Sequence, residues 1–540
     1  ARRFGLVFGA DTAGGGGYFV DSAANAELQA FVALSRVLGN LNPTPTERAL
    51  KSAGQGRPLP TRPGDARLVA ALLRALPPND DSVLPRVQAA LQASDLTAHV
   101  PSAGHPIPQT DAAGYLGMLL STTTWAELDA AEVPAAPGAD FFPGAVPTRA
   151  PRLATELIFP ADLVQRGGWL STGHFAAPGE VVSLRVLNGS ANGWSLRIGA
   201  HRDTLWHKDT WSRWPEITRE RALPAELDDD AFEVASPFGG LVYLVPGPKA
   251  KAARFELSGV VEAPYFVLGD ATSAADWLRR REAPAPWGEL ACDGVILTLP
   301  SGALRGLDDP VALMTWWNEA MACYPELRGE PQPARPERMV EDIQISAGWM
   351  HSGYPVMTHG ADDTESSAAV DLATLQSKGN WGYFHEFGHN AQKRDWTFGG
   401  TGEVTNNLFS LYLGERMAGI EPWENPWLAG QKKKPAAYFE RGADFAEWKR
   451  SPGLALMMYA EVQRAFGWEP FQVAMLSYLE LAPNERPRSD DEKRDRWLIE
   501  LSRASARNLG PYFERWGVPT SAAARAEVAE LEGWMPASYR

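Results

Sequence analysis

The chain has 540 residues, of which 44% are hydrophobic, and a net charge of −15. This length is enough for about two to four domains with cores of their own. The acidic balance would repel phosphate backbones, so we expect no nucleic-acid partner, and the absence of an apolar run of about eighteen residues predicts no membrane span. The chain begins at Ala1 without Met or an apolar signal core, from which we expect a processed product.

Residues 1–150 predict a helical N-terminal domain. Leu28, Phe31 and Val32 recur at helical spacing, and a similar pattern follows Asp81 and Ser82, which are suitable helix caps. The run Gly14–Gly17 lacks the Lys-Ser/Thr pair of a phosphate loop, so we expect a turn there. Prolines 134, 137, 143, 147 and 151 predict a linker at the end of this domain.

Residues 151–272 contain short segments in which apolar and polar residues alternate. Three segments predict strands separated by Gly, Pro and Asn turns: 182–186, 194–198 and 241–245. Regularly spaced short strands are typical of an antiparallel β-sandwich, which is the architecture that we expect for this domain.

Helical periodicity dominates residues 273–540, with some strand at 294–299. We expect the segment 339–357 to supply an edge strand and a substrate wall. Ser489 and Glu492 have the spacing of a capping box, which predicts the start of a late helix. The fold class is therefore predicted as multidomain α+β: a helical N-terminal domain, an antiparallel β-sandwich and a mainly helical catalytic domain at 273–540.

The most specific motif is His385-Glu386-Phe387-Gly388-His389, which spells H-E-x-x-H. Residues four apart lie on one face of a helix, so His385 and His389 can bind one Zn²⁺. Glu386 lies about 100° round the same turn, where it can act as general base toward an attacking water. The motif therefore predicts a zinc site of the catalytic kind.

A catalytic zinc site needs a third protein ligand, and two acidic residues follow the motif. Asp395 has the spacing of a metzincin third ligand, but that motif needs glycine where this chain has Gln392. Glu403 follows the Gly-rich break 398–402 and can open a second helix, so it is favoured as the ligand. Asn407, four residues later, is expected to support the site.

The motif and its surroundings resemble the M60-like, enhancin-type zinc peptidases. The resemblance runs from about 165 to 520 in family order, and the upstream region is similar to the bacterial branch that contains the immunomodulating metalloprotease. The segments that carry it are 169–173, 177–180, 238–243, 351–355, 381–390, 402–407, 466–471 and 508–517. It implies a gluzincin-type catalytic domain and, for many members, cleavage of mucin-type O-glycoproteins beside a glycosylated Ser or Thr.

This resemblance and the residue chemistry together predict further site residues. Tyr354, Tyr383 and His351 are candidate donors to the oxyanion that forms during peptide hydrolysis. A sugar needs a flat apolar face and polar partners for its hydroxyls. Among the 20 tryptophans, Trp381 and Trp396 flank the motif and could supply the face, while Arg338 and Asp342 could supply polar partners for an inner GalNAc.

The expected function is therefore zinc-dependent cleavage next to O-glycosylated Ser or Thr, by a secreted, cell-surface or periplasmic bacterial protein. Two alternatives stay open: a general zinc protease without a glycan requirement, and a glycan- or protein-binding module with an idle zinc site. Glu386 argues against the second, because a structural site needs no base. Cys292 and Cys323, the two cysteines, could pair or stay free.

Overall fold

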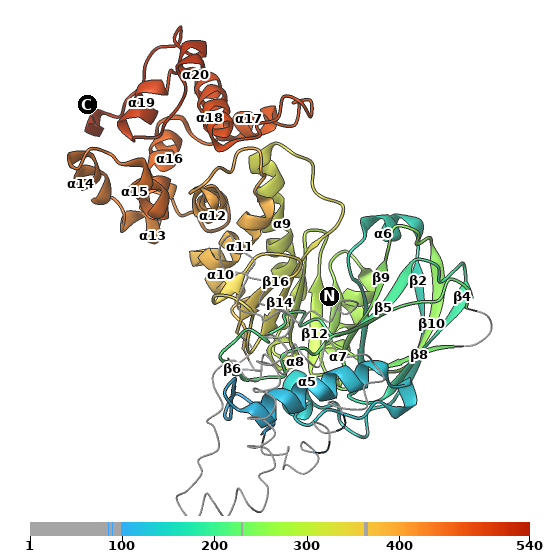
Figure 1. The fold of residues 1–540 in the computed structure, drawn as a ribbon. Coiled ribbons are helices and arrows are strands. Elements are labelled where there is room, and N and C mark those ends of the chain that lie inside the picture. Colours follow the sequence, from blue (N-terminus) through green and yellow to red (C-terminus); the bar gives the residue numbers. More distant parts are fainter. Residues whose placement is uncertain (1–84, 86–88, 90–98, 228–230, 361–365, 540) are drawn as a thin grey trace, which may run out of the picture. The chain divides into compact units, whose positions relative to one another are not determined.

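The computed structural model describes residues 85, 89, 99–227, 231–360 and 366–539 (Figure 1). Most of the helical domain predicted for 1–150, including its periodic segments and the run Gly14–Gly17, lies outside these residues. The described chain forms two compact units. The first holds the residues up to 263 with 283–287 and 342–346, and the second holds 264–282, 288–341 and the chain from 347 onward.

The first unit is built from antiparallel strands in the order β7-β5-β9-β3-β10-β4-β8, with β2 also paired to β10. The strands are β2 (Leu153–Phe159), β3 (Leu170–Ala176), β4 (Val181–Asn188), β5 (Trp194–Ile198), β7 (Arg219–Ala222), β8 (Phe232–Ala235), β9 (Gly240–Pro246) and β10 (Ala253–Glu262). Other elements are β1 (Ile107–Pro108), paired with β6 (Thr210–Trp211), and the helices α5 (Ala112–Glu127) and α6 (Ala161–Arg166).

Strand β10 holds this unit together, because its first part pairs with β2 and β4 and its last two residues pair with β3. The change of partner follows Gly259, which has φ +80° and where an added Cβ would lie 2.2 Å from the carbonyl oxygen of Val181. Only glycine fits such a conformation at such a close approach. Apolar side chains such as Trp194, Leu196 and Phe255 form the buried core of the unit.

The second unit begins with a six-stranded sheet in the order β11-β12-β13-β14-β16-β15. The strands are β11 (Tyr265–Val267), β12 (Trp287–Ala291), β13 (Val295–Pro300), β14 (Glu337–Asp342), β15 (Met350–His351) and β16 (Val356–His359). The pairs β11–β12 and β13–β14 are parallel, whereas β15 and β16 are antiparallel. The predicted edge strand in 339–357 is confirmed as β15.

Helices make up the rest of the second unit. They are α7 (Ala271–Arg280), α8 (Ser301–Arg305), α9 (Pro310–Arg328), α10 (Leu372–Lys378), α11 (Trp381–Ala391), α12 (Gly402–Ala418), α13 (Pro426–Ala429), α14 (Lys434–Glu440), α15 (Phe445–Arg450), α16 (Pro452–Phe466), α17 (Glu469–Ser477), α18 (Asp490–Ser505), α19 (Gly510–Arg515) and α20 (Ala522–Glu527). The predicted capping box is confirmed at the start of α18, where Ser489 and Glu492 cap each other's backbone N–H. None of the helices in the described ranges combines the length and apolar composition that crossing a bilayer requires.

The mixed α/β architecture, with a sheet region followed by a helical C-terminal part, agrees with the predicted class. Helices make up most of residues 273–540, as expected for the mainly helical domain, but the sequence predicted only the strands that correspond to β13 and β15 of the six-stranded sheet. Strand β14 shows the physical reason: it reads Glu-Arg-Met-Val-Glu-Asp, and its charged residues hide the apolar pattern of a buried strand. Cys292 and Cys323 are both free and buried, and burial raises their pKa values to about 11 and about 12.

Candidate metal centre

Helix α11 carries the H-E-x-x-H motif and is fixed at both ends. Asn380 caps its first turn, where the side-chain oxygen accepts the backbone N–H of Tyr383 at 3.1 Å. Phe384 and Phe387 are buried in the core of the second unit. His385 and His389, four residues apart, lie on the more exposed face, with side chains 21% and 20% exposed.

Gly388 lets helix α12 approach this face closely. A Cβ at position 388 would lie 2.7 Å from the backbone oxygen of Asn406, so any larger residue would push the two helices apart. The glycine inside the motif is therefore a packing requirement. It brings the side chains of the first turns of α12 within reach of both histidines.

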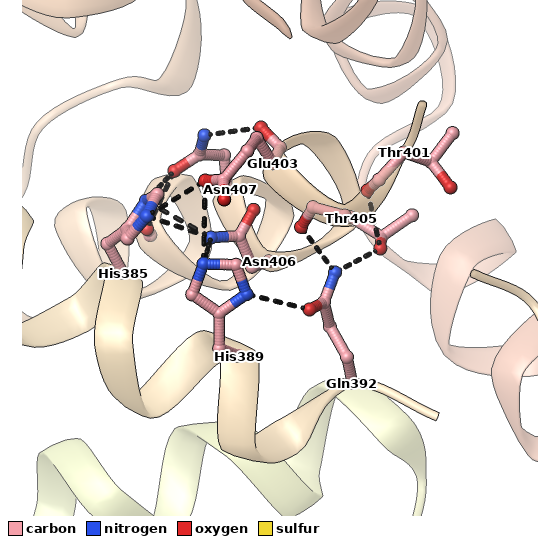
Figure 2. A network of polar contacts seen from close by, with 10 residues as sticks. His385, His389, Gln392, Thr401, Glu403, Thr405, Asn406 and Asn407 are labelled. Carbon is pink, nitrogen blue, oxygen red and sulfur yellow. Dashed lines mark hydrogen bonds and ion pairs between the residues drawn. The ribbon is translucent and has the colours of Figure 1, made fainter. Parts of the chain in front are cut away.

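Helix α12 begins at Gly402, directly after a turn closed by Thr401. The Thr401 hydroxyl donates to the carbonyl of Phe398 at 2.6 Å and accepts its N–H at 2.9 Å. Glu403 then stands in the first turn with φ −89° and ψ 16°, outside ideal helical geometry, and its side chain is 56% exposed. This placement directs its carboxylate to the histidines, as Figure 2 shows.

The three predicted ligands converge. Glu403 Oε2 lies 3.1 Å from Nε2 of His385 and 3.4 Å from Nε2 of His389. One donor atom from each residue falls within 4.8 Å of the others, which suits a single ion with ligand distances of about 2 Å. Two imidazole nitrogens and a carboxylate oxygen match the His₂Glu ligand set of catalytic zinc sites.

Asn407 and Gln392 fix the orientation of the two imidazoles (Figure 2). Asn407 donates to the carbonyl of Glu403 at 2.8 Å, so its oxygen faces His385 Nδ1, also at 2.8 Å. Gln392 donates to the carbonyl of Gly402 at 2.8 Å, so its oxygen faces His389 Nδ1 at 2.9 Å. Both Nδ1 atoms must therefore carry the proton, which leaves both Nε2 lone pairs free for a metal. Asn407 was expected in this role, whereas Gln392 was not.

Asn406 gives a further test of fit. Its amide nitrogen lies 3.0 Å from His389 Nε2 and 3.2 Å from His385 Nε2, while its buried oxygen has no hydrogen-bond partner. The same nitrogen lies 3.1 Å from His385 Nδ1, so this donor sits against the His385 ring and beside the His389 Nε2 lone pair, at the point where a cation would bind. Rotation of the amide by 180° would turn the unpartnered oxygen toward a cation at that point. The residues present therefore fit a zinc ion.

Glu386 follows His385 on α11 and is 9% exposed. Its place in the sequence puts it about 100° round the helix from His385, between the two histidines along the chain. Asp395, the alternative third ligand, is instead ion-paired with Arg486 and is absent from the group of converging donors. The chain turns away after Gln392, which has extended backbone angles, so Asp395 does not return to the site.

The three candidate oxyanion donors lie in different surroundings. Tyr383 is 3% exposed and packs in the core with its ring 5.7 Å from that of Trp317, which leaves little of it open to a substrate. Burial also raises its pKa. His351 on β15 and Tyr354 just after it are half-buried, with the Arg335 guanidinium 4.1 Å above the Tyr354 ring. Their roles stay predictions.

Three of the four predicted sugar contacts are structural. Trp396 is 1% exposed, with its ring 5.9 Å from that of Tyr478, so it offers no open face. Arg338 is buried in an ion pair with Glu289, and Asp342 is buried 2.7 Å from Arg213. Such partners remove the polar groups that a sugar would need, and their loss would leave an unpaired buried charge.

Trp381 is the remaining candidate. It opens α11 four residues before His385, so the two side chains share a face of the helix. Its half-buried ring stacks on that of Trp427, with centroids 5.1 Å apart and planes inclined by 27°. Trp427 is 36% exposed. In this aromatic pair, Trp381 and Trp427, the first lies one turn before the ligand His385 on α11 and the second belongs to α13.

Comparison with known proteins agrees with this geometry. Residues 146–258 match the N-terminal domain of M60-like peptidases, and residues 259–517 match peptidase M60, enhancin and enhancin-like. Residues 146–517 belong to the M60-like peptidase family. The histidines and carboxylate described above thus lie inside the peptidase domain of a metallopeptidase family.

Relatives in the family include animal proteins. TRPM8 channel-associated factor 2 of Bos taurus is 37% identical over 377 residues, which are 68% of this chain and 40% of that protein. The human protein of that name is 36% identical over 375 residues, again 68% of this chain and 40% of the relative. The chain therefore spans about two fifths of the length of these curated relatives. The expected bacterial branch stays a prediction.

Solved structures share the fold at low identity. The metallopeptidase IMPa of Pseudomonas aeruginosa, in complexes with T-antigen and with an O-glycopeptide, matches with a TM-score of 0.54 at 17% identity, covering 96% of this chain and 63% of that one. A conserved protein of unknown function from Bacillus anthracis matches with a TM-score of 0.57 at 22% identity, covering 71% and 81%.

Proposed function

We propose that this chain is a zinc-dependent endopeptidase that cuts protein chains next to O-glycosylated Ser or Thr. The observation that carries the peptidase part is the arrangement of His385, His389 and Glu403. Their donor atoms converge while both imidazole Nδ1–H groups are held away by Asn407 and Gln392. Three converging metal ligands next to a glutamate that can act as general base suit hydrolysis.

Zinc in such a site supplies Lewis-acid polarisation of a carbonyl and lowers the pKa of water. Glu386 accepts the proton of the attacking water and passes it to the leaving amine. Its burial beside the ligands keeps bulk water away from the carboxylate and strengthens its interaction with the transferred proton. Strand β15 lies at the edge of the sheet, so an extended substrate can add to it through backbone hydrogen bonds.

The glycan part rests on the aromatic pair and on a structural relative. Trp427 exposes part of its ring, and Trp381 extends the face of α11 that carries the ligands. Flat indole rings suit the apolar faces of sugars. IMPa, which shares this fold, has been solved with an O-glycopeptide. Substrates of this kind are presented outside cells, so we also propose a secreted or cell-surface location.

The test compares one mucin-type glycopeptide before and after enzymatic removal of its O-glycans, with digests read by mass spectrometry. We expect zinc-dependent cleavage of the glycosylated form and at least ~10-fold slower cleavage of the stripped form, since a lost stacking contact on the aromatic pair amounts to roughly 1.4 kcal/mol. Equal cleavage of both forms would leave a general zinc peptidase. No cleavage of either form by zinc-loaded protein would overturn the peptidase assignment.

A second candidate is a partner-binding protein whose zinc site is idle. The similarity to TRPM8 channel-associated factors, whose name describes association with a channel, favours it. The two readings differ in Glu386. If the site is idle, Glu386→Gln changes neither partner binding nor any turnover, whereas a peptidase loses its activity.

A further inference from the structure

Asn390, the residue after the ligand His389, joins helix α11 to the chain beyond β15. Its amide nitrogen donates to the carbonyl oxygen of Gly353 at 2.9 Å and to Oε2 of Glu337 at 3.0 Å. Its side-chain oxygen accepts the N–H of Gly353 at 3.0 Å. The Asn390 side chain thus forms hydrogen bonds with both the backbone N–H and the backbone carbonyl of Gly353.

The orientation of this amide follows from its partners. The backbone N–H of Gly353 can only donate and its carbonyl can only accept, so the amide oxygen and nitrogen of Asn390 cannot be exchanged. Gly353 has φ +131°, a conformation that favours glycine. These hydrogen bonds therefore fix the distance of the Gly353 backbone from helix α11 and the direction in which the chain runs there.

Gly353 lies between the two candidate site residues of this segment, His351 and Tyr354. The guanidinium of Arg335 lies 4.1 Å from the centre of the Tyr354 ring and contacts its face. Glu337 belongs to β14 inside the sheet, and its half-buried carboxylate accepts from the same amide nitrogen of Asn390 that donates to Gly353. Burial raises the pKa of Glu337, an effect that the Asn390 hydrogen bond partly offsets.

We propose that Asn390 is a positioning residue that sets the distance between the metal ligands on α11 and the segment 350–354, which includes edge strand β15. This inference rests on the proposed peptidase function. The hydrogen bonds of the Asn390 side chain go to Glu337 and Gly353, and none goes to a zinc ligand. Its loss should therefore shift the substrate wall and leave metal binding intact. A displacement of about 1 Å at a reacting centre can cost about 100-fold in rate.

Truncation at this position is compatible with folding. Asn390, Glu337 and Arg335 line a pocket of about 240 Å³. Water can enter such a polar space and satisfy the groups that Asn390 leaves behind. Asn390→Ala should therefore give a folded protein with a displaced or loosened segment.

The experiment compares Asn390→Ala with Asn380→Ala, which removes the cap at the opposite end of the same helix. Zinc per chain, KM and kcat are measured on zinc-loaded protein with one glycopeptide. For Asn390→Ala we expect unchanged zinc content and a KM raised at least ~10-fold. For Asn380→Ala we expect lower thermal stability with KM within about 2-fold of wild type, because unfolded molecules lower the active fraction and do not change KM.

Hydrogen exchange over residues 350–356 gives a readout that needs no activity. Exchange of this segment should be faster in Asn390→Ala and unchanged in Asn380→Ala, since the Gly353 N–H loses its acceptor in the first variant alone. Unchanged exchange, or an unchanged KM in an active enzyme, would overturn the inference. An inactive wild type overturns the proposed function instead, and hydrogen exchange still decides the role of Asn390.

Paired substitutions at positions 390 and 337 test whether the hydrogen bond between Asn390 and Glu337 itself matters. Asn390→Asp keeps the acceptor for Gly353 N–H but loses both donated bonds and places a carboxylate beside Glu337. Adding Glu337→Gln restores a donor and an acceptor between the two positions. We expect the double variant to recover at least ~3-fold in kcat/KM over Asn390→Asp, and additive losses would contradict the proposal.

Discussion

The side-chain oxygen of Gln392 accepts the Nδ1–H of His389 at 2.9 Å, and its nitrogen donates to the carbonyl of Gly402 at 2.8 Å. Gly402 precedes the third candidate ligand. Gln392 thus ties the end of α11 to the start of α12, and one side chain orients one ligand and anchors the backbone of another. Gln392, which stands where a metzincin motif would have glycine, thus helps to hold Glu403 in place through the carbonyl of Gly402.

Removal of either orienting amide should weaken zinc binding without abolishing it. We expect Gln392→Ala and Asn407→Ala each to lower zinc affinity by about 10–100-fold, because the imidazoles lose the acceptor that fixes their ring orientation. Competition with a chromogenic chelator measures this. Gln472→Ala, a half-buried glutamine on α17, serves as control and should keep wild-type affinity.

The third ligand can be tested by comparing two acidic residues. Glu403→Ala should lose most bound zinc, since it removes the oxygen that lies within 3.4 Å of both Nε2 atoms. Asp395→Ala should keep its zinc and lose at most about 1 kcal/mol of stability from its partly exposed ion pair with Arg486. Metal analysis of both purified variants decides it, and the reverse pattern would mean that Asp395 is the ligand.

Glu386→Gln should separate metal binding from catalysis. The variant keeps the three ligands, so we expect about one zinc per chain, while turnover falls by about 10²–10⁴-fold because the general base is gone. Initial rates at matched zinc content are the measurement. Substantial residual turnover in a zinc-dependent wild type would sink the assigned role.

The aromatic pair should matter for glycosylated substrates alone. We expect Trp381→Ala to lower kcat/KM on a glycopeptide by about 10-fold or more, which corresponds to a lost stacking contact of about 1.4 kcal/mol. Its effect on a stripped peptide should be small. Trp396→Ala is the contrasting variant: the loss of a buried indole should cost about 3–5 kcal/mol of stability and affect both substrates equally.

The buried carboxyl of Glu341 predicts a pH dependence of stability. Burial raises its pKa from 4.5 to about 7, against a hydrogen bond from Ser367 that lowers it. The folded state therefore binds the proton more tightly than the unfolded state, so this group favours folding below about pH 4.5 and loses that contribution as the pH rises to about 7. The full shift amounts to roughly 3 kcal/mol.

Glu341→Gln should remove this dependence. The free energy of unfolding in urea should fall more between pH 5 and pH 8 in wild type than in the variant. This comparison does not depend on which of the two proteins is more stable at a single pH. The nearby buried phenol of Tyr383 stays neutral over this range because burial raises its pKa. Equal slopes for the two proteins would mean that Glu341 ionises normally.

The sequence predicts those parts of the site whose chemistry is local. His385 and His389 share a face of their helix because they are four residues apart. The glycines before Glu403 mark the start of the next helix. Asn407 follows by the same rule, because it lies one turn after Glu403. These residues could be placed together before any tertiary structure was known.

Residues that depend on distant partners could not be predicted. Arg338 meets Glu289 across 49 positions and Asp342 meets Arg213 across 129, so their polar groups looked available in the sequence. Trp396 looked like a sugar-binding platform because it lies near the motif in the sequence, yet its ring is buried against Tyr478, 82 positions later in the chain. The role of Gln392 was not predicted because its orientation depends on a hydrogen bond to Gly402, which is ten residues away and comes near only through the intervening turn.

The two free thiols provide a built-in reporter of local opening. Cys292 and Cys323 lie in the second unit, and burial raises both pKa values far above neutrality, so neither presents a reactive thiolate in the native protein. Alkylating reagents should therefore label them only when the surrounding sheet and helices separate. Timed labelling followed by mass measurement would give the opening rate of the peptidase domain, with and without metal, and without any engineered probe.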